Sequence, residues 1–342
     1  MAFVEFYARR YLPEYRDSPI TQIRDFKQRY HHPLKLKQPL EQPDKDAYRI
    51  LFLGDSFTYG MGKAEYSFPR LVQEYFQKGG IRGIPSRKVQ SFNLGRISYS
   101  PSIYGILLRD YEPLLKPHLI IVAVDDSDPQ DDYYYHHFLI EGQDDLPLTV
   151  FPGLPWMPEF LKPLAREFKT IRLLFAAMEK SFHLPKLEDS FYGKWENRID
   201  HYKPGGAKRW KAQFSETLKR LDAIVRYCQR NKIDLVLVNY PYAPAVTKKY
   251  NLKWRERFSL NADQNYEPVF HDVQKKYAAV KKIPYYDFTD YLRRLPSLEG
   301  IYFEDNGHFT DQGNILFAQE IVKLIDPILN RNTGSHLSLR DH

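Results

Sequence analysis

The sequence predicts an α/β protein in which helices cover both faces of a five-stranded parallel sheet, giving three layers. Short apolar segments of strand length alternate along the chain with longer segments whose apolar residues recur at helical spacing. This alternation is typical of right-handed strand–helix–strand units. The composition also fits a globular chain, because 43% of the 342 residues are hydrophobic and 27% are charged.

The first strand is expected at residues 49–54, where the apolar run Ile-Leu-Phe-Leu ends in a glycine. A continuous apolar run of this length suits a strand that is buried on both faces. Similar runs predict the other four strands at residues 88–94, 119–124, 234–239 and 283–288. Helical spacing predicts helices at residues 68–78, 101–115, 207–231 and 264–281. A last helix is expected after Thr310, whose hydroxyl suits an N-cap.

One main domain is expected over residues 48–330, with a shorter segment at each end. Residues 1–47 are polar and irregular after a short amphipathic opening, and we expect an arm that packs on the core. Residues 331–342 form a C-terminal tail. The stretch at about 129–206 is too long for a simple crossover and is rich in Pro, Tyr and Trp. It is predicted to be an insertion after the third strand, partly helical over residues 158–180, that could cap the strand ends.

The formal net charge of +7 combines two regions of opposite sign. Residues 125–145 hold eight acidic residues and no lysine or arginine, so the rest of the chain carries +15. Five of these acids lie between Asp125 and Asp132, but no glycine occurs before Gly142 to allow the turn of a calcium loop. We therefore expect a solvated, partly pocket-lining loop and no metal site.

Several other classes of function are not indicated. The phosphate-loop pattern fails at Phe57 and Ala64, no dinucleotide fingerprint occurs, and no nucleic-acid-binding motif accompanies the basic balance, so neither a cofactor nor a nucleic acid is expected. The only cysteine, Cys228, lies among apolar residues at helical spacing and is predicted to be a buried small hydrophobe. No apolar run of about 18 residues predicts a membrane span. Residues 1–15 also lack the apolar stretch of a signal peptide.

Polar residues that follow the predicted strands are the candidates for chemistry, because ligands of open parallel sheets lie beyond the carboxyl ends of the strands. Ser56 follows the first strand after Gly54, which permits a sharp turn. A serine becomes a nucleophile when a base takes its proton. His308, with Asp305 three residues before it, supplies a candidate base and a carboxylate to orient that base. These are the parts of an acyl-transfer triad.

The motifs together resemble those of the SGNH (GDSL-like) hydrolase family. The segment ILFLGDSFTYG at residues 50–60 is followed by Asn-Leu-Gly at residues 93–95, and Asp-x-x-His closes the series at residues 305–308. The resemblance extends over roughly residues 47–326. It implies the flavodoxin-like fold of that family, with Ser56 as nucleophile and first oxyanion donor.

The same resemblance implies that His308 is the base and that Asp305 holds its imidazole. Two positions depart from the family pattern, because Ser98 stands where the family has an oxyanion-hole glycine and Ser127 stands where it has an asparagine. Loss of one oxyanion donor can cost about 10²–10³ in rate. A catalytically weak or inactive module that binds a polysaccharide or a partner protein therefore stays open as an alternative.

Residues at the same edge of the sheet are candidates for substrate binding. The loop after the fourth strand carries two tyrosines, each near a proline, and a stiff connection with packed tyrosines explains this loop equally well. The candidates are Asp55, Gly95, Asp128, Tyr240 and Tyr242.

The predicted function is that of a serine esterase or acyltransferase that acts on short acyl esters such as acetyl esters. A carbohydrate ester is preferred, because Trp156 and Trp195 in the insertion could stack on sugar faces, and because acidic residues at the site disfavour an anionic substrate. A transferase whose insertion excludes water is a further alternative. The resemblance to bacterial relatives suggests work outside the cytoplasm, and the sequence leaves the oligomeric state open.

Overall fold

The computed structural model describes residues 40–332, apart from residues 80, 144, 151–156, 169, 172–173, 175–198, 249–251, 262 and 265. Most of the predicted arm, most of the C-terminal tail and the middle of the insertion lie outside these residues. The division of the chain into arm, domain and tail therefore stays a prediction. Trp156 and Trp195, the candidates for stacking on a sugar, also lie outside the described residues.

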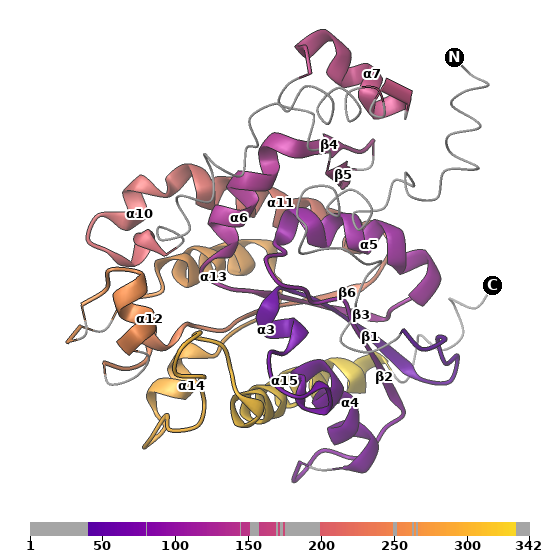
Figure 1. Cartoon of the computed structure of the whole chain (residues 1–342). Coiled ribbons are helices and arrows are strands. Elements are labelled where there is room, and N and C mark those ends of the chain that lie inside the picture. Colours follow the sequence, from indigo (N-terminus) through magenta and orange to yellow (C-terminus); the bar gives the residue numbers. More distant parts are fainter. Residues whose placement is uncertain are drawn as a thin grey trace.

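A five-stranded parallel sheet forms the centre of the structure, as the sequence predicts (Figure 1). Its spatial order is β2-β1-β3-β6-β7. Pairing places Leu53 of β1 beside Val122 of β3, and Val124 of β3 beside Asn239 of β6, so the carboxyl ends of these strands meet at one edge. The strands are β1 (Tyr48–Leu53), β2 (Val89–Asn93), β3 (Leu119–Val124), β6 (Asp234–Asn239) and β7 (Tyr285–Asp287).

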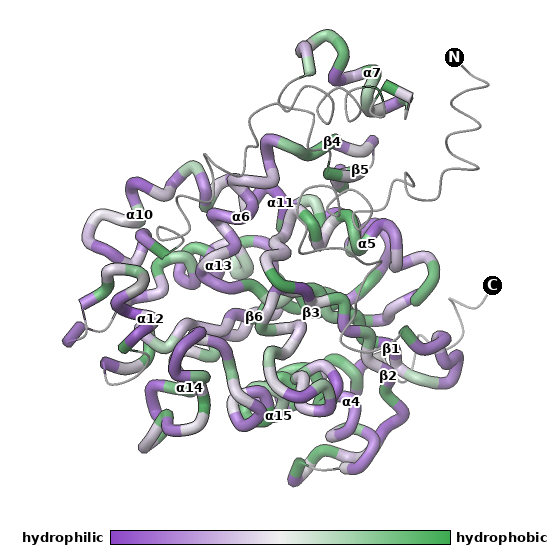
Figure 2. Tube along the Cα trace, in the orientation of Figure 1, coloured by the Kyte–Doolittle hydropathy of each residue, from purple (hydrophilic) through white to green (hydrophobic). Residues whose placement is uncertain are grey.

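Helices cover both faces of this sheet, which confirms the three-layer α/β class (Figure 1). Alternate residues of β1 separate the two cores: Ile50 and Phe52 pack toward α4 (Phe68–Lys78) and α15 (Asp311–Asn332). Leu51 and Leu53 pack toward the opposite layer. Figure 2 shows the hydrophobic residues concentrated along the strands and the helix faces turned toward them. The opposite layer contains α5 (Pro101–Leu115), α11 (Lys211–Arg230) and α13 (Val269–Lys281).

Two predicted helices have different bounds in the structure. The helix predicted at residues 264–281 begins only at Val269, because Pro268 has a non-helical backbone with φ −75° and ψ 77°. The helix predicted at residues 207–231 is divided at Trp210, which separates α10 (Gly206–Arg209) from α11.

The described parts of the insertion contain regular structure that the sequence did not indicate. The expected acidic loop is instead the helix α6 (Asp128–Tyr135), and a hairpin of β4 (Leu139–Glu141) and β5 (Pro147–Val150) follows it. Arg220 of α11 anchors this hairpin by donating to Glu141 at 2.8 Å. The short helix α7 (Lys162–Glu167) lies within the range for which helix was predicted.

Shorter elements complete the structure. They are α3 (Ser56–Tyr59), η3 (Ala64–Tyr66), η4 (His136–Phe138), η6 (Glu159–Leu161), η8 (Asp200–Tyr202), η9 (Ala243–Ala245), α12 (Leu252–Arg257) and α14 (Thr289–Arg293). Within the described part of the chain, none of the helices combines the length and the apolar character that crossing a bilayer requires.

Candidate active site

Ser56 stands at the carboxyl end of β1, where it begins the single turn of α3. Asp55 caps this turn, because its Oδ1 accepts a hydrogen bond from the N–H of Phe57 at 2.9 Å. Gly54 is required by space: a Cβ atom there would lie 1.9 Å from Oγ1 of Thr58. The side chain of Ser56 is thus held at the strand end, and the residue is 7% exposed.

His308 meets Ser56 at this edge. Its Nε2 lies 2.7 Å from Oγ of Ser56, within hydrogen-bond distance. The loop that carries His308 is fixed on its far side, where Oγ1 of Thr310 accepts from the N–H of Gly313 and so caps α15. The ring of Phe57 packs against the imidazole with a centroid separation of 4.8 Å. The structure therefore brings together the serine and the histidine that the sequence proposed as nucleophile and base.

The orienting position beside His308 belongs to Asn306 and not to Asp305. Oδ1 of Asn306 lies 3.2 Å from Nδ1 of His308 and also accepts from the His308 N–H at 3.1 Å. The second bond closes an Asx turn, which spans two residues and so selects the residue two positions before the histidine. The side chain of Asp305 is exposed. The role that the family resemblance implies for Asp305 is not supported by this geometry, and Asn306 was not considered from the sequence.

The environment of His308 favours its neutral form. Burial lowers the pKa of His308 to about 4, and the charge of Asp125 opposes this effect only in part. A hydrogen bond from Nδ1–H to Asn306 assigns the tautomer in which Nε2 accepts from Ser56. At neutral pH the imidazole is thus in the form that a base requires.

Two backbone N–H groups are candidates for an oxyanion hole. Ser56 is the first residue of α3, so its N–H has no acceptor within the helix. Ser98 is buried and has a positive φ of 61°, a conformation that glycine adopts without strain. The hydroxyl of Tyr135 holds this turn by donating to the Ser98 carbonyl at 2.9 Å. Ser98 thus has the backbone conformation typical of a glycine, as its place in the family pattern suggests.

Ser127 and Gly95 have other partners. The hydroxyl of Ser127 donates to Oδ1 of Asp125 at 2.8 Å, so in this conformation its hydrogen does not serve an oxyanion. The N–H of Gly95 donates to Oδ1 of Asn93 at 2.9 Å. A Cβ atom at Gly95 would lie 2.6 Å from Cβ of Thr58, so this glycine allows close packing against α3. The Ser127 hydroxyl is thus not available as the oxyanion donor that the sequence predicts, and the substrate-binding role of Gly95 stays a prediction.

The acids after β3 are buried, in contrast to the solvated loop expected from the sequence. Asp125 and Asp128 are 0% exposed and Asp55 is 2% exposed. Oδ1 of Asp125 accepts from the N–H groups of Ser127 and Asp128, and the N–H of Asp125 donates back to Oδ2 of Asp128 at 3.1 Å. Burial, followed by the charge of Asp125, raises the pKa of Asp55 and of Asp128 well above the usual range. Hydrogen bonds thus replace water around this cluster.

Tyr240 and Tyr242 lie behind the site and support it. The hydroxyl of Tyr242 donates to Oδ2 of Asp125 at 2.7 Å, and that of Tyr240 donates to Oδ1 of Asp55. Tyr242 also stacks on Trp254, with ring centroids 4.8 Å apart. Because both tyrosines are buried, the structure gives them contacts with the acidic cluster in place of the predicted substrate contacts.

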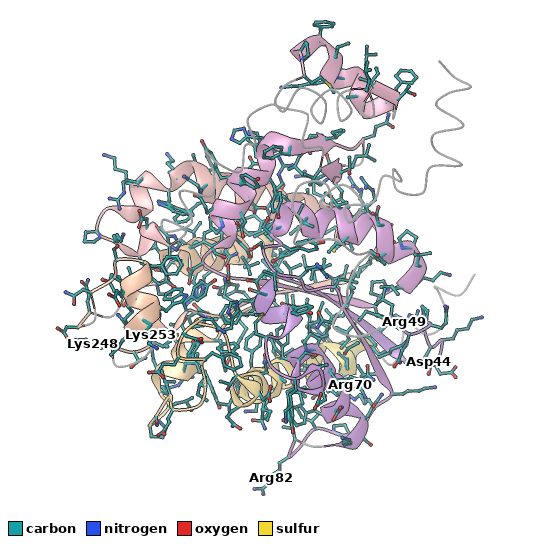
Figure 3. All side chains as sticks on the ribbon, in the orientation of Figure 1. Asp44, Arg49, Arg70, Arg82, Lys248 and Lys253 are labelled. Carbon is teal, nitrogen blue, oxygen red and sulfur yellow. The ribbon has the colours of Figure 1, made fainter. Side chains whose placement is uncertain are left out.

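Basic and acidic side chains occupy different places around the site. Basic side chains such as Arg82, Lys248 and Lys253 project from the periphery (Figure 3). The acids of the site lie inside, at the strand ends. Across the described ranges, no group of three or more His, Cys, Asp or Glu side chains is arranged to hold a metal ion.

The chain was compared with family models, curated proteins and solved structures, and only solved structures resemble it. No protein-family model matches the chain, and no curated protein matches it significantly. Solved structures that resemble it include a lipase/acylhydrolase from Enterococcus faecalis, with 13% identity, a TM-score of 0.43, and coverage of 82% of this chain and 96% of that one. A GDSL-like lipase from Bacteroides thetaiotaomicron has 15% identity and a TM-score of 0.40, covering 85% and 92%. An acetyl xylan esterase has 13% identity and a TM-score of 0.43, covering 81% and 99%. Similarity at this level concerns the fold alone.

Proposed function

We propose that the protein is a serine hydrolase of carboxylic esters, of the SGNH type. The observation that carries the proposal is the 2.7 Å contact between Oγ of Ser56 and Nε2 of His308. In the first step Nε2 takes the hydroxyl proton while Oγ attacks the acyl carbon. The N–H groups of Ser56 and Ser98 stabilise the oxyanion, and His308 then gives the proton to the leaving alcohol. Water, activated by the same imidazole, releases the acid from the acyl-enzyme.

Asn306 has a narrower role in this scheme than a carboxylate has in a Ser-His-Asp triad. Its neutral oxygen orients the imidazole and selects the tautomer, but it stabilises the imidazolium less than an anion does. Asp125 supplies part of the missing charge, since it acts to raise the pKa of His308. We therefore expect His308 to act as a base, with less stabilisation of its protonated form than in a Ser-His-Asp triad.

The preferred substrate is a neutral short acyl ester, with an acetylated carbohydrate as the first choice. The charge of Asp125, which acts on His308, disfavours an anionic substrate at this edge. One of the similar solved structures is an acetyl xylan esterase. Transfer of the acyl group to a sugar hydroxyl uses the same acyl-enzyme and is included in the proposal.

The test uses a fluorophosphonate probe and p-nitrophenyl acetate. We expect the wild-type protein to be labelled at Ser56 and to release p-nitrophenol, and Ser56→Ala to do neither. Ser91→Ala is a matched control, because Ser91 lies within β2 and its buried Oγ lies outside the site. Absence of labelling and turnover in the folded wild-type protein would sink the proposal.

A catalytically weak module that binds a polysaccharide is the second candidate. It is favoured by the hydrogen bond that commits the Ser127 hydroxyl to Asp125 and by the neutral partner of His308. Binding of acetylated xylan without labelling of Ser56 would support this candidate.

A further inference from the structure

A second group of ionisable residues lies under the candidate active site, and the proposed reaction does not use it directly. Asp126 is 0% exposed, and its two oxygens face imidazoles from different elements. Oδ1 lies 3.4 Å from Nε2 of His201 in η8, and Oδ2 lies 3.4 Å from Nε2 of His271 in α13. The hydroxyl of Tyr202 also donates to Oδ2. The turn after β3 is thus tied to α13 and to the segment in which the insertion returns to the core.

His271 connects this group to the edge strand of the sheet. Its Nδ1 lies 3.1 Å from Oδ1 of Asp287, the last residue of β7. Asp287 is held in turn by the N–H of Thr289 at 2.9 Å, and the hydroxyl of Tyr285 donates to the carbonyl of His271 at 3.0 Å. The imidazole therefore lies between two carboxylates, one that follows β3 and one that ends β7.

The two carboxylates keep this imidazole charged. Burial lowers the pKa of His271, but Asp126 and Asp287 outweigh it and raise the pKa to about 10. Burial also disfavours the charged form of Asp126 and so acts to raise its pKa. The two histidines outweigh burial and bring the pKa of Asp126 well below the usual range. The ion pair is desolvated, so removal of one partner leaves an uncompensated buried charge.

The same turn carries residues of the candidate active site on its other side. Asp125 accepts from the N–H groups of Ser127 and Asp128 and from the hydroxyl of Tyr242, whereas its neighbour Asp126 is directed at His271. Consecutive carboxylates thus hold the turn from two directions. Asp126 is the neighbour of Asp125 in this turn, and the charge of Asp125 acts on His308.

We propose that His271 is a positioning residue for the proposed reaction: its imidazolium, paired with Asp126 and Asp287, fixes the turn of residues 125–128 beside Ser56 and His308. His201 and Tyr202 extend this tie to the insertion. The inference rests on the proposed function, but the ion pair and its hold on the turn can be tested without any activity.

The first experiment is independent of activity. We expect the imidazole carbon and proton resonances of His271 to remain those of an imidazolium from pH 5 to pH 9, with a midpoint near 10. In His271→Gln, amide exchange at Ser127 and Asp128 should accelerate by about tenfold or more, whereas exchange at Gly95, which is held by Asn93, should not change. A neutral His271 at pH 7, or unchanged exchange at the turn, overturns the inference.

The second experiment measures fluorophosphonate labelling of Ser56. Labelling in folded His271→Gln should slow on the order of 10²-fold, as expected when a reacting group is misplaced by about 1 Å. His118→Gln is the matched control, because His118 stacks on Tyr48 at the other end of β1 and should label at the wild-type rate. Wild-type labelling by folded His271→Gln shows a purely structural role and overturns the inference.

Asp287→Asn is the milder variant if His271→Gln does not fold. It removes one of the two carboxylates, so the midpoint of His271 should fall toward neutral pH. In Asp287→Asn, the rate of Ser56 labelling should then decline with rising pH at this lower midpoint. If the decline in Asp287→Asn occurs at the same pH as in the wild-type protein, the inference is contradicted. If the wild-type protein is not labelled at all, the proposed function fails, while the resonance and exchange measurements still decide whether His271 holds the turn.

Discussion

Asn306 Oδ1 lies 3.2 Å from Nδ1 of His308 and occupies the place that a carboxylate has in a Ser-His-Asp triad. The same oxygen accepts from the His308 N–H, so one neutral group sets both the loop and the tautomer. The orienting position thus belongs to Asn306, whereas the family resemblance implies its neighbour Asp305.

Replacement of Asn306 should therefore affect catalysis, and replacement of Asp305 should not. Asn306→Ala removes the acceptor for Nδ1–H, and we expect kcat/KM for p-nitrophenyl acetate to fall by about 10²-fold, within the usual contribution of a general base. Asp305→Ala removes an exposed side chain and should leave kcat/KM unchanged. The reverse pattern would restore the triad that the family resemblance implies.

The pH dependence of the reaction should show a base whose pKa is unusually low. Since burial lowers the pKa of His308 to about 4, kcat/KM should fall to half near pH 4 and not near the ordinary value of 6.5. Asn306→Asp places a carboxylate beside Nδ1, which should move this limb to higher pH. A wild-type acid limb at pH 6 to 7, measured by initial rates, contradicts the prediction.

Ser98→Gly tests the backbone conformation at the second oxyanion donor. Relief of the positive φ gains about 1–2 kcal/mol, and the larger chain entropy of glycine offsets about 0.5–1 kcal/mol of that gain. We expect a small net stabilisation in urea unfolding, with full activity because the N–H remains. Ser98→Ala keeps the φ and loses only the hydroxyl, so it should show no such gain.

Gly95→Ala should be strongly destabilising, because the new methyl would lie 2.6 Å from Cβ of Thr58 and from the N–H nitrogen of Tyr59. We expect a loss of about 3 kcal/mol in the free energy of unfolding, at the upper end for overpacking. Gly83→Ala is the control: it has a positive φ but open space around its Cβ, and should lose only about 1 kcal/mol. Equal losses would show that space at Gly95 is not the constraint.

The ion pair of His271 should make the fold sensitive to alkaline pH. Its pKa is about 10 in the folded protein and near 6.5 when unfolded, so its stabilising contribution is complete below pH 6.5. This contribution is lost as pH rises from 6.5 through 10. Urea unfolding should thus show lower stability at pH 9.5 than at pH 7, and a smaller difference in His271→Gln. An identical pH slope in the two proteins would contradict this.

The sheet and most helices could be predicted because they depend on local patterns. The strands at residues 119–124 and 234–239 and the helices at residues 68–78 and 101–115 have the predicted bounds. Continuous apolar runs and helical spacing are properties of neighbouring residues, so long-range contacts did not alter them. The insertion, in which α6 replaces an expected loop, has no such pattern.

The site was only partly predictable, because its details depend on contacts between distant residues. The meeting of Ser56 and His308 was predicted, but the burial of Asp125 depends on Tyr242, which lies 117 positions away. A run of acidic residues in a sequence suggests an exposed segment, because the hydroxyl and amide groups that could satisfy buried carboxyl groups are not apparent from the sequence. Asn306 was missed because a two-residue turn, and not a motif, places it beside the imidazole.

Ser56 and His308 lie 252 positions apart in the chain, yet their side chains meet beside two helices that pack on each other. Ser56 precedes α4, His308 precedes α15, and these two helices share one hydrophobic core. A chain in which α15 has not yet packed on α4 therefore lacks part of the core beside the loop that carries His308. Under the proposed function, ester cleavage would therefore depend on the docking of α15 against α4, because Thr310 of the His308 loop caps α15.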